Sequence, residues 1–188
     1  MLLDILRKIY SFFLDIIQTL LLAAAVFLVI YVFLFRPFQV NGNSMYPNFH
    51  DKEYVLTNIV ALHFEDVKLG DIIVFKSPAD PEKDFIKRVI GTPGDTILIK
   101  SGNVYINGKL LDESPYLNAS IQTMPGTFIK EDQEVKANED EFFVLGDNRS
   151  NSSDSREWGF VERKLIIGKS FFIYWPPGSM GTVNNPYN

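Results

Sequence analysis

The sequence predicts a mainly β protein, with a single transmembrane helix at the N-terminus and one β domain after it. Two observations favour this fold class. An uncharged apolar run of twenty residues lies near the start of the chain, and beyond it the apolar residues occur in short runs separated by Gly, Pro, Asn and Asp. The 188 residues leave room for this helix and one domain of about 150 residues.

The predicted membrane anchor spans residues 16–35. A helix of this length extends about 30 Å, which is the thickness of the hydrocarbon core of a bilayer. A cleaved secretory signal would have a small-residue cleavage site after a shorter apolar region, whereas Arg36-Pro37 follows here. We therefore expect a retained anchor, preceded by a short cytoplasmic or interfacial segment at residues 1–15. Basic residues lie on both sides of the anchor, so its charges do not determine the orientation.

Residues 36–188 are expected to form the β domain. The runs rich in Val, Ile, Phe and Tyr that predict its strands are 53–58, 71–75, 85–91, 96–100, 103–111, 141–145 and 170–175. Asn107-Gly108 predicts a hairpin turn, because both central positions of a type I′ turn need a positive φ. The segment at about 101–138 is expected to be a small insertion on this domain, since its part 112–138 is more polar and less periodic than its flanks.

The composition excludes several classes of function. A net charge of −5 without a long Lys/Arg run argues against nucleic acid as a partner. The chain has no cysteine, which removes disulfides, cysteine nucleophiles and thiolate metal sites. Its two histidines, His50 and His63, lack the spacing of a zinc site, and residues 146–157 lack the pattern of a calcium loop. We therefore expect no metal and no other cofactor.

Ser44 is a candidate nucleophile, because it stands in a turn-forming stretch shortly after the anchor. The G-x-S-x-G pattern of a nucleophile elbow fails at Tyr46, and no S-x-x-K motif with a distant K-T-G is present. A histidine base stays open, although neither histidine has local support. Lysine is the other candidate base. The alternative is that Ser44 is only a turn residue.

Lys87 is the candidate base, because strand alternation places it on one face with Phe85 and Val89. Apolar neighbours desolvate an ammonium group and lower its pKa, by up to about 3 to 5 units when burial is complete. A lysine whose pKa is brought near the working pH is a competent general base. The alternative is a lysine that extends along an edge strand to water.

Four segments, in this order, resemble the motif boxes of the type I signal peptidases: 43–49 (NSMYPNF), 70–75 (GDIIVF), 87–95 (KRVIGTPGD) and 146–156 (GDNRSNSSDSR). These enzymes are membrane-anchored serine proteases that remove signal peptides from exported proteins. The resemblance implies a β-rich catalytic domain built from coiled sheets. It also implies a dyad in which Ser44 is the nucleophile and Lys87 the general base.

The resemblance assigns further roles in the last segment. Ser152 matches a serine that hydrogen-bonds the lysine and orients it. Asp154 and Arg156 match a pair that steadies the loop, and Asp147 and Asn148 match other fixed positions that support the site.

One position departs from part of the family. Some members have, two residues before the nucleophile, a serine that helps to form the oxyanion hole, and this chain has Gly42 there. The backbone N–H of Ser44 can be one donor, and the second donor is not identified. A glycine here and the small insertion indicate an enzyme of the Gram-positive type.

The resemblance also implies the substrate and the location. Signal peptides of exported preproteins would bind as an added strand and be cleaved after small residues at −1 and −3. The matching positions that would line the pockets are Phe38, Val40, Met45, Phe49, Phe85 and Ile86; the alternative for these is a place in the core. The implied location is the plasma membrane of a bacterium, single-pass, with the catalytic domain on the outer face. Phospholipid is then a partner, and the protein export machinery is a further expected one.

Two other functions stay open. One is a signal-peptidase-like paralogue without activity, and the other is a membrane-anchored β module that only binds. A self-processing Ser/Lys protease similar to the SOS-response repressors is disfavoured, because those proteins are soluble and carry a DNA-binding segment.

Overall fold

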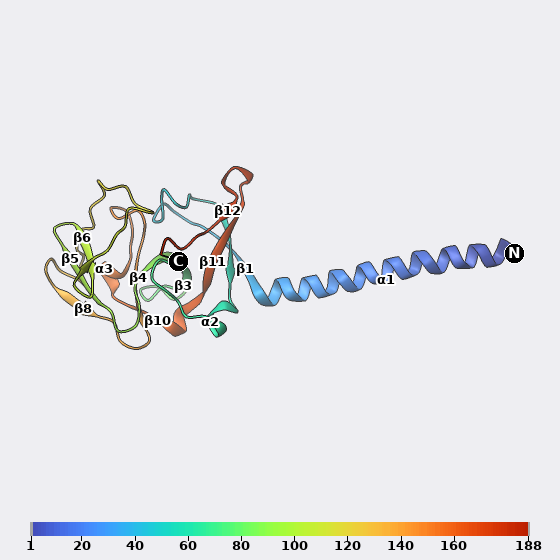
Figure 1. The fold of residues 1–188 in the computed structure, drawn as a ribbon, viewed down its shortest axis with the longest axis horizontal. Coiled ribbons are helices and arrows are strands. Elements are labelled where there is room, and N and C mark those ends of the chain that lie inside the picture. The colour runs from blue at the N-terminus through green and yellow to red at the C-terminus, as the bar shows by residue number, and fades with distance from the viewer. Residues whose placement is uncertain (1, 188) are drawn as a thin grey trace.

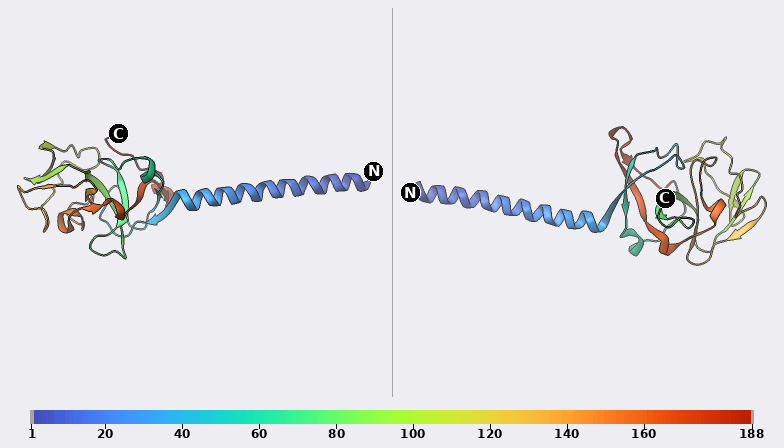
Figure 2. Two further views of the ribbon diagram at one scale, coloured as in Figure 1. Left: turned by 90° about the horizontal axis from the view of Figure 1, so that it is seen from below. Right: turned by 180° about the vertical axis from the view of Figure 1, so that it is seen from behind.

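A long helix, α1 (Leu2–Leu34), projects away from a β domain in the computed structural model, which describes residues 2–187 (Figures 1 and 2). Its part Leu3–Val29 contains an 18-residue stretch with a mean hydropathy of 2.4 and is long and apolar enough to cross a membrane. No other helix among the described residues meets both conditions. From Leu2 onward the expected N-terminal segment and the expected anchor form one continuous helix. Phe35, expected to end the anchor, instead begins a strand. Pro37 disfavours helical backbone at Arg36, the residue before it, and Phe35 already pairs with Asn58 in the sheet.

The domain is mainly β, as predicted. Its strands are β1 (Phe35–Gln39), β2 (Tyr54–Asn58), β3 (Ile72–Lys76), β4 (Asp84–Gly91), β5 (Thr96–Lys100), β6 (Asn103–Ile106), β7 (Lys109–Leu110), β8 (Glu134–Lys136), β9 (Glu141–Leu145), β10 (Val161–Glu162), β11 (Ile166–Trp175) and β12 (Gly181–Thr182). Its short helices are α2 (Ala61–Phe64), α3 (Ser155–Trp158), η1 (Arg163–Leu165) and η2 (Pro177–Ser179).

The strands form two antiparallel sheets. The larger sheet has the order β1-β2-β11-β3-β4-β9-β10, with β12 paired to β11, and the smaller has the order β7-β6-β5-β8. The smaller sheet lies at the end of the domain away from α1 (Figure 1). The predicted hairpin is present in it, because Asn107 and Gly108 have φ of +53° and +75° and join β6 to β7. Most of the segment expected as an insertion therefore belongs to this sheet and its connections.

All seven predicted strands are present, with shifts at their ends. The sequence missed β1, β8, β10 and β12. Two of these are only two residues long, and β1 contains a proline, which weakens a strand pattern. A proline is tolerated in β1 because this strand is at the edge of the sheet.

Three apolar clusters hold the domain together. One joins the two sheets through residues such as Ile90, Ile97 and Phe143. Another packs around Phe75 on β3 and Val161 on β10. The third consists of Val40, Met45, Phe49, Val55 and Ile72, with partly buried neighbours around it. It fixes the turn that follows β1, which carries Ser44.

Candidate active site

Ser44 lies in a turn that begins at the end of β1. Gly42 has a φ of +91°, a conformation that L side chains rarely adopt, so the chain can bend here. After the serine, Met45 and Phe49 are 0% and 2% exposed and anchor the turn in the core. The Phe49 N–H donates to the Met45 carbonyl over 2.9 Å. The serine therefore lies in a turn that is anchored rigidly in the core.

Lys87 lies on β4 and is only 4% exposed. Its Nζ is 5.1 Å from the centre of the Phe85 ring and donates to the Ile86 carbonyl over 3.0 Å. Burial lowers the pKa of Lys87 from 10.5 to about 8, although the nearby carboxylates of Asp154 and Asp147 act in the opposite direction. A substantial part of Lys87 is therefore neutral at mildly alkaline pH.

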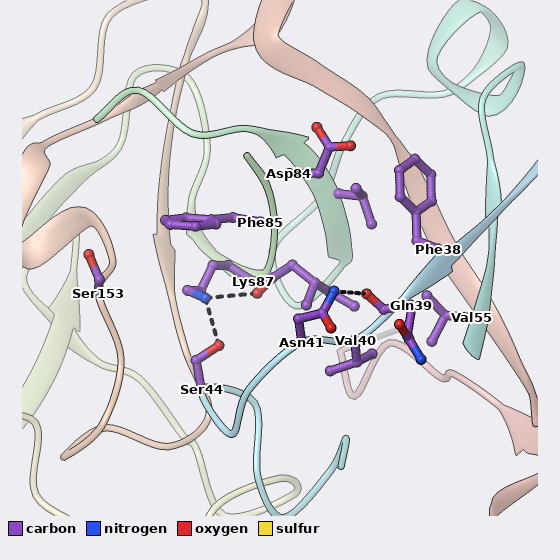
Figure 3. Close-up of a pocket in the computed structure, with 12 residues that line it drawn as sticks. Phe38, Gln39, Val40, Asn41, Ser44, Val55, Asp84, Phe85, Lys87 and Ser153 are labelled. Atoms are coloured by element: carbon purple, nitrogen blue, oxygen red, sulfur yellow. Dashed lines mark hydrogen bonds between the residues drawn. The ribbon is translucent and has the colours of Figure 1, made fainter. Parts of the chain in front are cut away.

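The fold brings these two residues together. Lys87 Nζ donates to Ser44 Oγ over 2.8 Å, although 43 positions separate them in the sequence (Figure 3). When the amine is neutral, the same contact can carry the Ser44 proton to Nζ. The described pair thus has the geometry of a nucleophile with its general base.

The loop of residues 146–156 packs directly against the serine turn. The Asn148 N–H donates to the Ser44 carbonyl, and Asn148 Nδ2 donates to the Asn43 carbonyl, each over 3.0 Å. Gly146 lies so close that a Cβ there would collide with Ser152 Oγ and the Ser44 carbonyl. Asn148 therefore links the loop to the serine turn through both its backbone and its side chain, and its supporting role in catalysis stays a prediction.

Ser152 is in the expected loop, but its hydroxyl makes no hydrogen bond to Lys87 in the described structure. Its Oγ is buried and has no hydrogen-bond partner among the described residues. The two acceptors of Lys87 Nζ are instead Ser44 Oγ and the Ile86 carbonyl. The role of Ser152 in orienting the lysine stays a prediction.

Two buried ion pairs stabilise the loop. Arg156 Nε and Nη2 donate to the Asp154 carboxylate over 2.8 and 2.9 Å, and Asp154 also accepts from the Gly146 N–H over 3.0 Å. Arg88 Nε and Nη2 donate to the Asp147 carboxylate over 2.9 and 2.7 Å. Each arginine has its carboxylate partner, as a buried guanidinium requires.

The sequence interpretation missed Arg88 as the partner of Asp147. It follows Lys87 on β4, so alternation puts it on the opposite face, and it is also only 4% exposed. Two adjacent basic residues in an otherwise apolar run could have indicated this pairing. They point to opposite faces of the strand, so each buried cation needs a polar partner on its own face.

The segment 112–138 contacts this same loop, a relationship that the sequence did not indicate. Arg149 donates to both carboxylate oxygens of Glu113, over 2.6 and 3.1 Å, and makes a short hydrogen bond to Thr123 Oγ1. Arg156 Nη1 donates to the Met124 carbonyl over 3.2 Å. The segment therefore holds the loop from the side of the smaller sheet.

A cleft of about 200 Å³ opens beside the dyad (Figure 3). Of the residues expected to bind substrate, Phe38, Val40, Phe85 and Ile86 line it, together with Ser44 and Lys87. Met45 and Phe49 do not line it. Both are buried in the core cluster below the serine turn. Val40 belongs to the same cluster but also lines the cleft.

Gly42 does not offer its backbone N–H to an oxyanion. That group donates to Asp51 Oδ1 over 2.6 Å. This bond is also the main cause of the lowered pKa of the Asp51 carboxyl group. The contribution of Gly42 is the bend before Ser44.

A mainly β domain that follows an apolar helix, with a serine hydroxyl bonded to a buried lysine beside a cleft, has the arrangement of a serine hydrolase with a lysine base. The sequence matches the family described as signal peptidase, peptidase S26, over residues 13–175. The chain belongs to this family.

Two relatives with this family name support the same assignment by their sequences. Signal peptidase I of Bacillus amyloliquefaciens is 38% identical over 167 residues, which cover 87% of this chain and 88% of the relative. Signal peptidase IB of Staphylococcus aureus (strain COL) is 35% identical over 188 residues, which cover 93% and 97%. A crystal structure of a signal peptidase I from Enterococcus faecalis V583 is 30% identical and has a TM-score of 0.46; the match covers 56% of this chain and 97% of that one.

Proposed function

We propose that this protein is a membrane-anchored serine endopeptidase that cleaves signal peptides from exported preproteins after small residues at −1 and −3. Membership of the signal peptidase family supports the reaction class. The observation that carries the assignment of residues is the 2.8 Å contact between Lys87 Nζ and Ser44 Oγ.

In the proposed reaction, Ser44 Oγ attacks the scissile carbonyl carbon while neutral Lys87 takes the hydroxyl proton. Lys87 then gives that proton to the leaving amine, and a water molecule, activated in the same way, hydrolyses the acyl-enzyme. The developing oxyanion accepts a hydrogen bond from the Ser44 N–H. Asp147, Asn148, Asp154 and Arg156 hold the surrounding loop. The Ser152 hydroxyl has no partner among the described residues, and in this proposal it turns to Lys87 and orients the amine during the reaction.

The proposed substrate strand enters between two strand edges that are free among the described residues. β1 is at the edge of the larger sheet, and β4 pairs with β9 only from Arg88 onward, so the outer side of Asp84–Lys87 has no strand partner. The cleft lies between these edges, with walls from both strands. Main-chain pairing then provides binding, and the alternate side chains provide selectivity.

The walls of the cleft favour small substrate side chains. Phe38 and Val40 come from the β1 side, and Phe85 and Ile86 from β4. These bulky apolar groups line both sides of the cleft. This supports a preference for small residues at −1 and −3.

The proposed location is the bacterial plasma membrane, with one span and the catalytic domain on the outer face. Only ten positions separate the end of α1 at Leu34 from Ser44, so the dyad lies near the bilayer. Substrates tethered to the same membrane reach a high effective concentration at the dyad. Phospholipid and the export machinery are the partners that this location implies.

The deciding experiment gives the detergent-solubilised protein a precursor with an Ala-x-Ala site. The wild type should cleave it, and Ser44→Ala and Lys87→Met should each lose nearly all activity. The unfolding temperature of each variant is measured to show that the variant is folded. A folded but inactive wild type would favour the inactive paralogue or the binding module, and full activity of Lys87→Met would exclude this lysine as the base.

A further inference from the structure

Asn48 lies in the serine turn and links three segments that are distant in the sequence. Its Nδ2 donates to Asp147 Oδ2 over 2.8 Å and to the Tyr116 carbonyl over 2.9 Å. Both acceptors are oxygens without a proton, so the NH2 group of the amide, and not its oxygen, must face them. The nucleophile turn is therefore tied to the 146–156 loop and to the segment 112–138 by one side chain.

The carboxylate of Asp147 connects this amide to the strand of the base. It is fully buried, and it accepts from Arg88 Nε and Nη2 as well as from Asn48. Arg88 adjoins Lys87 on β4, and its Nη1 also donates to the Gly70 carbonyl over 3.0 Å. One carboxylate thus receives a donor from the strand that carries the base and a donor from the turn that carries the nucleophile.

We propose that Asn48 is a positioning residue that, acting through Asp147, sets the distance between Ser44 and Lys87. Within the described structure a single hydrogen bond joins the dyad residues, so their separation depends on how the turn and β4 are held relative to each other. A misplacement of about 1 Å can lower a rate on the order of 100-fold, which makes such a link important for catalysis. Asn48 does not line the cleft, so it acts on geometry and not on substrate binding. The inference rests on the proposed function for its kinetic consequence only.

The test compares Asn48→Ala with Asn48→Gln, which keeps the amide. We expect kcat of Asn48→Ala to fall on the order of 10- to 100-fold with KM within about twofold of the wild type. Asn48→Gln should recover most of that loss. Asn103→Ala is the matched control and should keep the wild-type kcat. Among the described residues, the amide nitrogen of Asn103 makes a local hydrogen bond to the Ser101 carbonyl, in the region of the smaller sheet.

A second measurement does not depend on activity. The Asn148 N–H donates to the Ser44 carbonyl, so its hydrogen exchange, followed by NMR on the full chain in detergent, reports how the turn is docked. We expect its protection to fall at least about tenfold in Asn48→Ala and to stay unchanged in Asn103→Ala. If Asn48→Ala does not fold, Asn48→Leu takes its place, since it removes the donor, keeps a side chain of similar size and adds no negative charge beside Asp147.

An unchanged kcat, a rise in KM alone, or unchanged Asn148 protection would each overturn the proposal. An inactive wild type would instead count against the proposed function, and the exchange measurement would still decide whether Asn48 docks the turn.

Discussion

Lys87 Nζ and Ser44 Oγ are 2.8 Å apart, and the lysine that makes this contact is almost completely removed from water. The same burial that brings the amine to the serine also lowers its pKa to about 8. Position and protonation state are thus set by one feature, the apolar surroundings of β4.

The first prediction concerns pH. Because Lys87 must be neutral to accept a proton, kcat should rise about tenfold per pH unit below pH 8 and level off above about pH 9. The measurement is the rate of precursor cleavage from about pH 6 to 9.5, with the stability of the enzyme checked at each pH. A rate that does not vary over this range would contradict the role of Lys87.

The second prediction concerns stability. The folded pKa of Lys87 lies below the unfolded value, so between about pH 8 and 10.5 the unfolded chain binds one proton more than the folded chain. The free energy of unfolding therefore rises with pH across this window, by roughly 3 kcal/mol for this group. Lys87→Met removes the buried charge, so this variant should be inactive but more stable than the wild type near pH 7.

Denaturant unfolding at pH 7 and pH 10 checks this. Other titrating groups are common to both proteins, so the difference between wild type and Lys87→Met should shrink as the pH rises. A difference that is constant with pH would show that the pKa of Lys87 is not lowered in the folded protein.

The third prediction concerns the closest backbone approach in the site. Gly146→Ala places a Cβ against Ser152 Oγ and the Ser44 carbonyl, so the loop or the serine turn must shift. We expect kcat to fall on the order of 100-fold and the free energy of unfolding to fall by about 1 to 3 kcal/mol. Gly181→Ala is the control, because a Cβ there meets no atom within 4 Å. Equal kcat values for the two variants would contradict the geometry.

The fourth prediction separates the wall of the cleft from the core beneath it. Val40 lines the cleft, so Val40→Ala should improve cleavage after residues larger than alanine, on the order of tenfold in relative kcat/KM. Met45 is buried but lies outside the cleft, and Met45→Ala should instead lower the free energy of unfolding by about 2 to 5 kcal/mol without changing this preference. Competition between precursors with Ala and Val at −1 or −3 measures the preference. A relaxed preference in Met45→Ala would place that residue in the substrate pocket.

The sequence predicted the elements that have a strong local pattern. The apolar helix, the seven main strands and the Asn107-Gly108 turn each depend on neighbouring residues, and the order of the four segments was enough to identify the family. It did not reveal β1 as a strand, because its pairing with β2 overrides a weak local pattern that contains Pro37. The two-residue strands β10 and β12 also exist only because their partners do.

The sequence by itself determined which residue types were available for the chemistry: without cysteine and with two isolated histidines, a serine nucleophile in this chain had lysine as its best-supported base. Only the tertiary structure decided which groups meet. In the folded protein, Asp147 accepts hydrogen bonds from both Arg88 and Asn48. Met45 and Phe49 lie in the core and not in the cleft, where the sequence had placed them. The Gly42 N–H donates to Asp51. The physical reason is that hydrogen bonds and ion pairs depend on distances of about 3 Å between segments, and those distances follow from the packing of the sheets and not from any local pattern.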